Sequence, residues 1–229
     1  MSNTPSLQAL YPHLGAAKRD PATLNAALLE SVRSKAGESR DANTRFFEDQ
    51  GAALVAAAQA LAGVWRAGGK LFAMGNGGSS CDASHFTVEF LHPITAGRPA
   101  LPAVNLGADL AMISAVGNDV GFDQIFARQV IAQAASGDGL IGFSTSGASA
   151  NLIAAFEVAK QRGLVTFGLA GGDGGRMKTC GLVDHCLVVE TSSIHRIQEC
   201  HVTAYHILWD LVHTILSDTR GGLTPGSRA

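Results

Sequence analysis

The stretch KLFAMGNGGSSCDASHFTVEF, residues 70–90, contains the three local patterns that decide the fold. Residues 70–75 form a short apolar run, which is typical of a strand that is covered on both faces of a sheet. Residues 75–80 are almost all glycine and serine and predict a tight loop. From residue 79 onward the pattern predicts a helix, so the stretch reads as strand, loop and helix.

The same order of patterns recurs along the rest of the chain. Apolar runs that predict strands lie at residues 70–75, 100–106, 138–144, 164–170 and 184–190. Helical patterns follow them at residues 79–91, 109–134 in two pieces, 149–162, 173–181 and 195–217. This alternation predicts an α/β fold with α/β/α layers around a five-stranded parallel sheet. We expect the flavodoxin-like strand order 2-1-3-4-5, in which the first and third strands flank the ligand crevice.

Length and charge favour one domain and exclude two classes of partner. The 229 residues suffice for one sizeable core, and we predict a domain over 43–218, an N-terminal extension at 1–42 and a C-terminal tail at 219–229. A net charge of -2 without runs of Lys or Arg argues against nucleic-acid binding. The apolar runs are shorter than the roughly 18 residues that span a bilayer, so no membrane partner is expected.

The cysteines and the first residues predict a cytoplasmic protein. Cys81, Cys180, Cys186 and Cys200 are scattered and form no CxxC pair, which favours reduced thiols. The opening sequence MSNTPSLQALYPHLG lacks the basic and apolar regions of a signal peptide.

A helix is predicted in FFEDQGAALVAAAQALAGVWRAG, residues 46–68, and it is apolar on nearly all sides. Such a helix should lie between other elements or between subunits. The preceding residues, 1–42, are expected to be loosely packed or helical.

The first small-residue loop is GNGGSS, residues 75–80. Gly75, Gly77 and Gly78 permit tight turning and close approach of the backbone, and Ser79 can cap the following helix. The first amides of that helix favour an anionic group.

The second loop, STSGAS at residues 144–149, follows the third predicted strand. It offers the hydroxyls of Ser144, Thr145, Ser146 and Ser149 and the amides of a helix start near Ser149. Hydroxyls and amides can hold a small phosphomonoester without a lysine. Neither loop matches the Walker A or the GxGxxG pattern. Both can also be ordinary strand-to-helix turns, but two such loops at corresponding positions favour a shared phosphate site.

His85 and Glu89 are four residues apart, so a helix places them on one face. The pair suits a metal ion or acid–base chemistry, and the alternative is a surface pair without a ligand. Because the helix begins at the first loop, Glu89 lies about 15 Å along its axis. A substrate of several carbons could bridge that distance.

The last helix carries Gln198 and His206, with His201 and His213 read as structural. About 12 Å of helical rise separates Gln198 from His206. One ion held by both would need long reaches or a ligand from a neighbouring chain.

Together, these motifs resemble those of the SIS (sugar isomerase) family, and in particular its phosphoheptose isomerases. The similarity extends from roughly residue 46 to 216 and is carried by GNGGSSCDASHF (75–86), GNDVGF (117–122), STSGASAN (144–151), GGDGGRM (171–177) and RIQECH (196–201). The resemblance implies a homotetramer with sites at subunit boundaries. It also implies a ketose–aldose isomerase that interconverts sedoheptulose 7-phosphate and D-glycero-D-manno-heptose 7-phosphate, generally for lipopolysaccharide heptose.

The resemblance also implies a role for each matching residue. One zinc per subunit would be held by His85, Glu89, Gln198 and His206, with Glu89 as the base and His206 as its acid partner. The residues implied to contact the sugar phosphate are Asn76, Gly77, Gly78, Ser79, Glu89, Asp109, Gln198, Ser144, Thr145, Ser146 and Ser149.

Two positions depart from the family pattern near the expected substrate. Pro93 stands where related isomerases have an arginine, and His195 where they usually have an aspartate. The sequence therefore leaves the identity of the sugar substrate open. A non-catalytic SIS scaffold, of the type that binds the replication initiator, and a sugar-phosphate sensor remain as alternatives.

Overall fold

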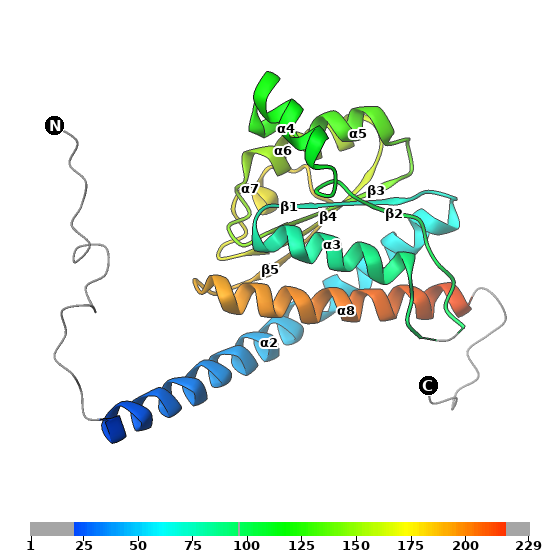
Figure 1. The fold of residues 1–229 in the computed structure, drawn as a ribbon. Helices are drawn as coiled ribbons and strands as arrows, with labels where there is room; N and C mark the ends of the chain where they lie inside the picture. The colour runs from blue at the N-terminus through cyan, green and yellow to red at the C-terminus, as the bar shows by residue number, and fades with distance from the viewer. Residues whose placement is uncertain (1–20, 96, 219–229) are drawn as a thin grey trace, which may run out of the picture. The chain divides into compact units, whose positions relative to one another are not determined.

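The computed structural model describes residues 21–95 and 97–218 (Figure 1). The chain divides into two compact units between Glu38 and Ser39. The predicted C-terminal tail, 219–229, and residues 1–20 of the predicted extension lie outside the described residues. The domain limits of 43–218 therefore stay a prediction.

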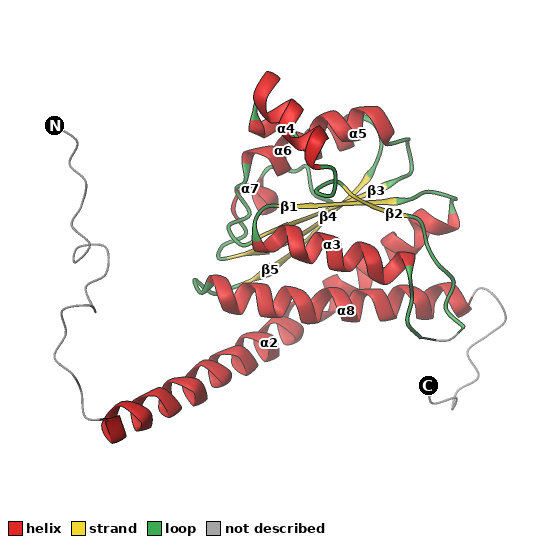
Figure 2. Cartoon of the chain, viewed as in Figure 1, coloured by secondary structure: helices red, strands yellow, loops and turns green. Residues whose placement is uncertain are grey.

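The strands of the second unit form one parallel sheet in the order β2-β1-β3-β4-β5. They are β1 (Leu71–Gly75), β2 (Ala103–Asn105), β3 (Gly139–Ser144), β4 (Val165–Gly171) and β5 (His185–Val189). Figure 2 shows these strands, in yellow, between two layers of helices. The predicted α/β class and the flavodoxin-like order are confirmed.

Helices cover both faces of the sheet and bury alternate strand residues. They are α2 (Pro21–Arg66), α3 (Gly78–Leu91), α4 (Leu110–Asp119), the 3-10 turn η2 (Phe122–Gln124), α5 (Ala127–Gln133), α6 (Ala150–Gln161), α7 (Gly175–Thr179) and α8 (Ile194–Asp218). Leu71 and Ala73 of β1 pack in the core under α2, α3 and α8. Phe72 and Met74 point to the other face, into the core under α4, α5 and α6.

Helix α2 begins 25 residues before the predicted start at Phe46, because it runs from Pro21 to Arg66. In the second unit it buries one side, and Val55 on another side stays exposed. Its packing between subunits stays a prediction. The buried residues of α2 are Ala42, Phe46, Leu54, Ala57, Ala58, Leu61, Ala62, Val64 and Trp65.

Among residues 21–95 and 97–218, every helix is too short or too polar to cross a membrane.

Candidate active site

The two small-residue loops leave neighbouring strands at the same edge of the sheet. Gly75 at the end of β1 is paired with Phe143 of β3, so the chain turns out of both strands at the same level. Beyond them, the amides of Asn76 and Asn151 exchange two hydrogen bonds of 2.9 Å. The two loops therefore lie side by side at the carboxyl ends of β1 and β3, where the predicted strand order expects the ligand crevice.

In the first loop, the backbone of glycine rather than a serine starts helix α3. Gly77 occupies the N-cap with φ of 54°, a conformation that favours glycine. Ser79 is buried inside the first turn, so the prediction that Ser79 caps the helix is wrong. At Gly78 a Cβ atom would overlap the Nε2 atom of Gln198. Only a glycine lets the amide of Gln198 approach this close.

In the second loop, Ser144 is the centre of a group of hydroxyls. Its Oγ lies 3.5 Å from Ser146 Oγ and 3.3 Å from Ser149 Oγ, and it accepts a hydrogen bond from the amide of Gly147. Ser149 is the N-cap of α6, so the helix begins where the sequence predicted. Thr145, which lies between Ser144 and Ser146 in sequence, is half-buried. Hydroxyls and a helix start thus meet at one place, as a phosphate group requires.

A candidate metal-binding group, made of His85, Glu89 and His206, lies between α3 and α8 and is called the metal-binding group below. His85 Nε2 is 3.1 Å from Glu89 Oε1, and the ring centroids of His85 and His206 are 4.9 Å apart. One ligand atom from each of the three side chains lies within 4.8 Å of the others. Two imidazoles and a carboxylate at this separation have the chemistry of a zinc site that leaves a position for water or substrate.

Helices α3 and α8 lie side by side and run in the same direction (Figure 1). Three facing pairs each differ by 120 in residue number: Gly78 with Gln198, His85 with Tyr205, and Glu89 with Trp209. Gln198 therefore lies near the start of α3, roughly 10 Å before His85 along the axis. The structure brings three of the four expected metal ligands together and places Gln198 beside the first loop.

Two titratable groups beside His85 escaped the sequence analysis. Burial raises the pKa of Asp82 to about 6, although His85 opposes the shift. One of its oxygens, Oδ2, has no hydrogen-bond partner among the described residues. Burial also raises the pKa of Tyr205, and the charges of Asp82 and Glu89 add to the effect. Asp82 lies one turn before His85 on α3, a spacing that could have signalled it.

The remaining sequence candidates lie apart from this group. Asp109 is exposed and caps α4, where its carboxylate accepts a hydrogen bond from the amide of Met112. His201 and His213 are buried in the core, as expected of structural residues. His195 is exposed at the start of α8.

Comparison with known proteins places this fold and these motifs in one family. The sequence profile of the SIS domain matches residues 36–171. The chain belongs to the SIS domain family. A phosphoheptose isomerase of Geobacter sp. is 41% identical over 185 residues, which are 81% of this chain and 95% of the relative. One of Solidesulfovibrio magneticus is 41% identical over 197 residues, which are 86% and 95% of the two chains.

Solved structures agree with this assignment to the SIS family. A phosphoheptose isomerase from Francisella tularensis superposes with a TM-score of 0.78 at 36% identity and covers 81% of this chain and 98% of its own. One from Neisseria gonorrhoeae gives 0.76 at 36% identity, with 82% and 99% covered.

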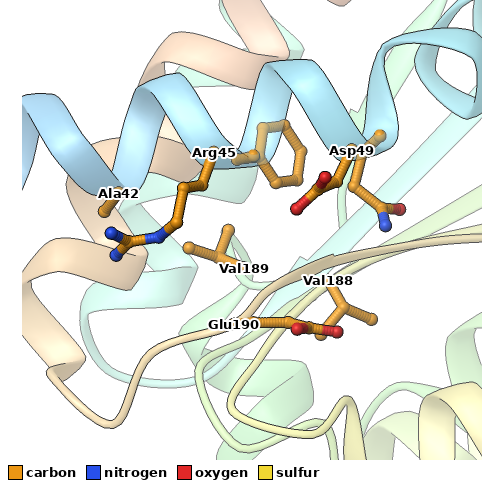
Figure 3. Close-up of a pocket in the computed structure, with 8 residues that line it drawn as sticks. Ala42, Arg45, Asp49, Val188, Val189 and Glu190 are labelled. Carbon is orange, nitrogen blue, oxygen red and sulfur yellow. The ribbon is translucent and has the colours of Figure 1, made fainter.

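A surface pocket of this SIS chain lies elsewhere, between α2 and the end of β5. Figure 3 shows Arg45 and Asp49 on α2 and Glu190 just after the strand. It is lined by Ala42, Arg45, Phe46, Asp49, Gln50, Val188, Val189 and Glu190. Among the described residues, it shares no side chain with the two loops or the metal-binding group.

Proposed function

We propose that the chain is a metal-dependent ketose–aldose isomerase acting on a sugar phosphate, with sedoheptulose 7-phosphate as its substrate. The observation that carries the proposal is that ligand atoms of His85 and Glu89 on α3 and of His206 on α8 lie within 4.8 Å of one another. Helix α3 begins at the first small-residue loop. The phosphoheptose isomerases of Geobacter sp. and Solidesulfovibrio magneticus align with this chain over 95% of their own length.

The phosphate would bind at the second loop and the sugar would extend along α3. Hydroxyls around Ser144 and the start of α6 provide neutral donors for the phosphate. The sugar would pass the first loop to reach Glu89, eleven residues after Gly78 and about 16 Å along the helix. The proposed sugar contacts are Asn76, Gly77, Gly78, Ser79, Glu89, Asp109 and Gln198, and the phosphate contacts are Ser144, Thr145, Ser146 and Ser149.

Isomerisation requires a base that moves a proton between the first two carbons. Glu89 would take the proton from C1 of the ketose and return it at C2 of the enediol. His206 would donate a proton to the carbonyl oxygen at C2 as that oxygen gains negative charge, and would take the proton of the O1 hydroxyl when C1 becomes the aldehyde. The ligands proposed for zinc are His85, Glu89 and His206 of one chain together with Gln198. Because Gln198 of the same chain lies about 12 Å before His206 along α8, we propose that a neighbouring subunit supplies it. When bound, the ion supplies Lewis-acid stabilisation of the carbonyl oxygen at C2.

The wider setting follows from the family resemblance. We propose a cytoplasmic homotetramer with one zinc per subunit, in which subunit boundaries contribute to the sites. The product would feed the synthesis of lipopolysaccharide heptose. The exposed apolar side of α2, with Val55, suits contact with another subunit.

The test combines metal analysis with an isomerisation assay. Wild type should contain zinc and convert sedoheptulose 7-phosphate, whereas Glu89→Gln should lose turnover but keep its assembly, because the exchange preserves shape and removes basicity. Glu157→Gln, at an exposed position of α6, is the matched control. Equal rates for wild type and Glu89→Gln would remove Glu89 from the mechanism.

The same assay separates the alternatives. Sugar-phosphate binding without turnover in wild type would indicate a sensor. A wild-type protein that binds neither metal nor sugar phosphate would indicate a scaffold. A screen of phosphorylated sugars of five to seven carbons would then identify the substrate, and a preference for another sugar would direct attention to Pro93 and His195.

A further inference from the structure

Two side chains of α8 hydrogen-bond to α3 at the metal-binding group. The hydroxyl of Tyr205 lies 2.7 Å from His85 Nδ1. One turn further on, the indole Nε1 of Trp209 donates to the backbone carbonyl of Glu89 at 2.8 Å. The two bonds repeat the spacing of the ligands themselves, since each pair is four residues apart on its own helix.

The hydroxyl of Tyr205 is held in a fixed place. Tyr205 is 1% exposed, and its ring packs on Phe86 and Phe143 with centroid separations of 5.7 and 5.9 Å. A side chain packed in this way cannot follow a rotation of the imidazole. The position of its oxygen therefore limits the orientations of His85 that keep the hydrogen bond.

The donor and acceptor roles in the two contacts of His85 depend on its tautomer. An ionised carboxylate only accepts hydrogen bonds, so the contact with Glu89 needs a proton on His85 Nε2. In the neutral imidazole, Nδ1 is then an acceptor and Tyr205 donates to it. For Nε2 to hold a cation, the proton must instead lie on Nδ1. A phenol hydroxyl can also accept, so Tyr205 can serve both tautomers.

Trp209 supplies a hydrogen-bond donor that the backbone following α3 lacks. In a continuing helix, the carbonyl of Glu89 would accept from the amide of residue 93, but Pro93 has no N–H. The neighbouring carbonyls of Val88 and Phe90 accept from the amides of His92 and Leu101. The carbonyl of Glu89 receives the indole of Trp209 instead, so the backbone of the proposed base is fixed from α8.

We propose that Tyr205 and Trp209 are positioning residues that hold His85 and Glu89 in the orientation in which they meet His206. Their role in metal binding rests on the proposed function. The hydrogen bond between Tyr205 and His85 does not, because it belongs to the metal-free protein. The two parts can therefore fail separately.

Tyr205→Phe removes one oxygen and keeps the ring. In metal-free protein with 15N-labelled histidine, the ring nitrogens of His85, assigned with a His85→Gln variant, should shift between wild type and Tyr205→Phe. Zinc affinity, measured by competition with a chromophoric chelator, should fall about 10- to 100-fold. The absorption spectrum of the cobalt-substituted protein should change as well.

Trp209→Phe tests the second bond, and Trp65→Phe is its matched control. Trp65 Nε1 also donates to a backbone carbonyl, that of Pro102, at 3.1 Å. Trp209→Phe should weaken zinc binding about tenfold, while Trp65→Phe should leave it as in wild type. Similar losses in both variants would mean a general packing effect and would overturn the role of Trp209.

The outcomes distinguish this inference from the proposed function. If His85 resonances are identical in wild type and Tyr205→Phe, the positioning role of Tyr205 is refuted whether or not metal binds. If those resonances shift but wild type binds no zinc, the metal proposal fails and the positioning of His85 by the Tyr205 hydrogen bond stands. If zinc binds equally well to wild type and both variants, positioning for the metal is refuted while the isomerase proposal stands.

Discussion

The two loops and the α3–α8 pair form the same candidate site in different ways. The loops consist of glycines and hydroxyls that follow two adjacent strands, and their geometry comes from the backbone. The helix pair depends on long side chains that meet across two helices 120 residues apart in sequence. Local sequence patterns therefore reveal the loops, whereas the contacts within the helix pair become visible once the register of the two helices is known.

We predict that the two loops and the α3–α8 pair serve different steps of the reaction. The loops should bind the unchanged end of the substrate, and the helix pair should act on the carbons that react. Substitutions in the helix pair should then lower kcat, and substitutions in the loops should raise KM.

The largest effect is expected for His206→Gln, in the helix pair. Because His206 is the proposed proton donor and a proposed metal ligand, its loss should lower kcat by at least about 100-fold. Steady-state kinetics would measure it against His185→Gln as a control, because His185 stacks on Phe167 at the start of β5 and belongs neither to the loops nor to the metal-binding group. A kcat equal to that of wild type would assign His206 to packing.

The next effect is expected on the pH dependence of stability. It arises from His201, on the side of α8 that packs on the sheet. Burial lowers the pKa of His201 to about 4, although a hydrogen bond with the carbonyl of Ala170 opposes the shift. Since the unfolded chain keeps a pKa near 6.5, protonation favours unfolding, and stability is lost as the pH falls from about 6.5 to 4. The loss reaches about 3 kcal/mol at most.

Denaturant titrations at several pH values would measure this loss. The acid-induced decrease in the free energy of unfolding should be smaller in His201→Gln than in wild type. Other groups, such as Asp82, contribute equally to both proteins, so the difference isolates His201. Parallel curves for the two proteins would contradict the account.

The smallest effect is expected in the loops. Ser144→Ala should raise KM for the sugar phosphate roughly tenfold, because one hydrogen bond to a charged group is lost, and kcat should change less. Ser114→Ala, an exposed serine of α4, is the control. A fall in kcat without a change in KM would contradict the assignment of substrate binding to the loops and of the chemical step to the helix pair.

Most of the fold follows from the sequence because parallel strands are continuous apolar runs. The run 138–144 became β3, Gly139–Ser144, almost unchanged. The run 100–106 shrank to Ala103–Asn105, since Pro102 cannot donate to a neighbouring strand. The helix predicted at 173–181 is shorter, Gly175–Thr179, because Gly174 and Gly175 adopt positive φ.

The candidate site could be predicted only in part. The spacing of His85 and Glu89 indicated their common face, and the structure brings ligand atoms of both within 4.8 Å of His206. Tyr205 and Trp209 were missed because aromatic residues in an apolar helix look like core packing. Their polar atoms become informative once α8 is placed beside α3.

The central claim is that one metal ion lies between α3 and α8 where the sugar reacts. Anomalous scattering at the zinc edge, from crystals of the zinc-loaded protein, tests it most directly. The account predicts one strong peak per chain, about 2.0–2.2 Å from His85 Nε2, a Glu89 oxygen and a ring nitrogen of His206. A zinc peak elsewhere, or full turnover in crystals without a peak at this group, would contradict it.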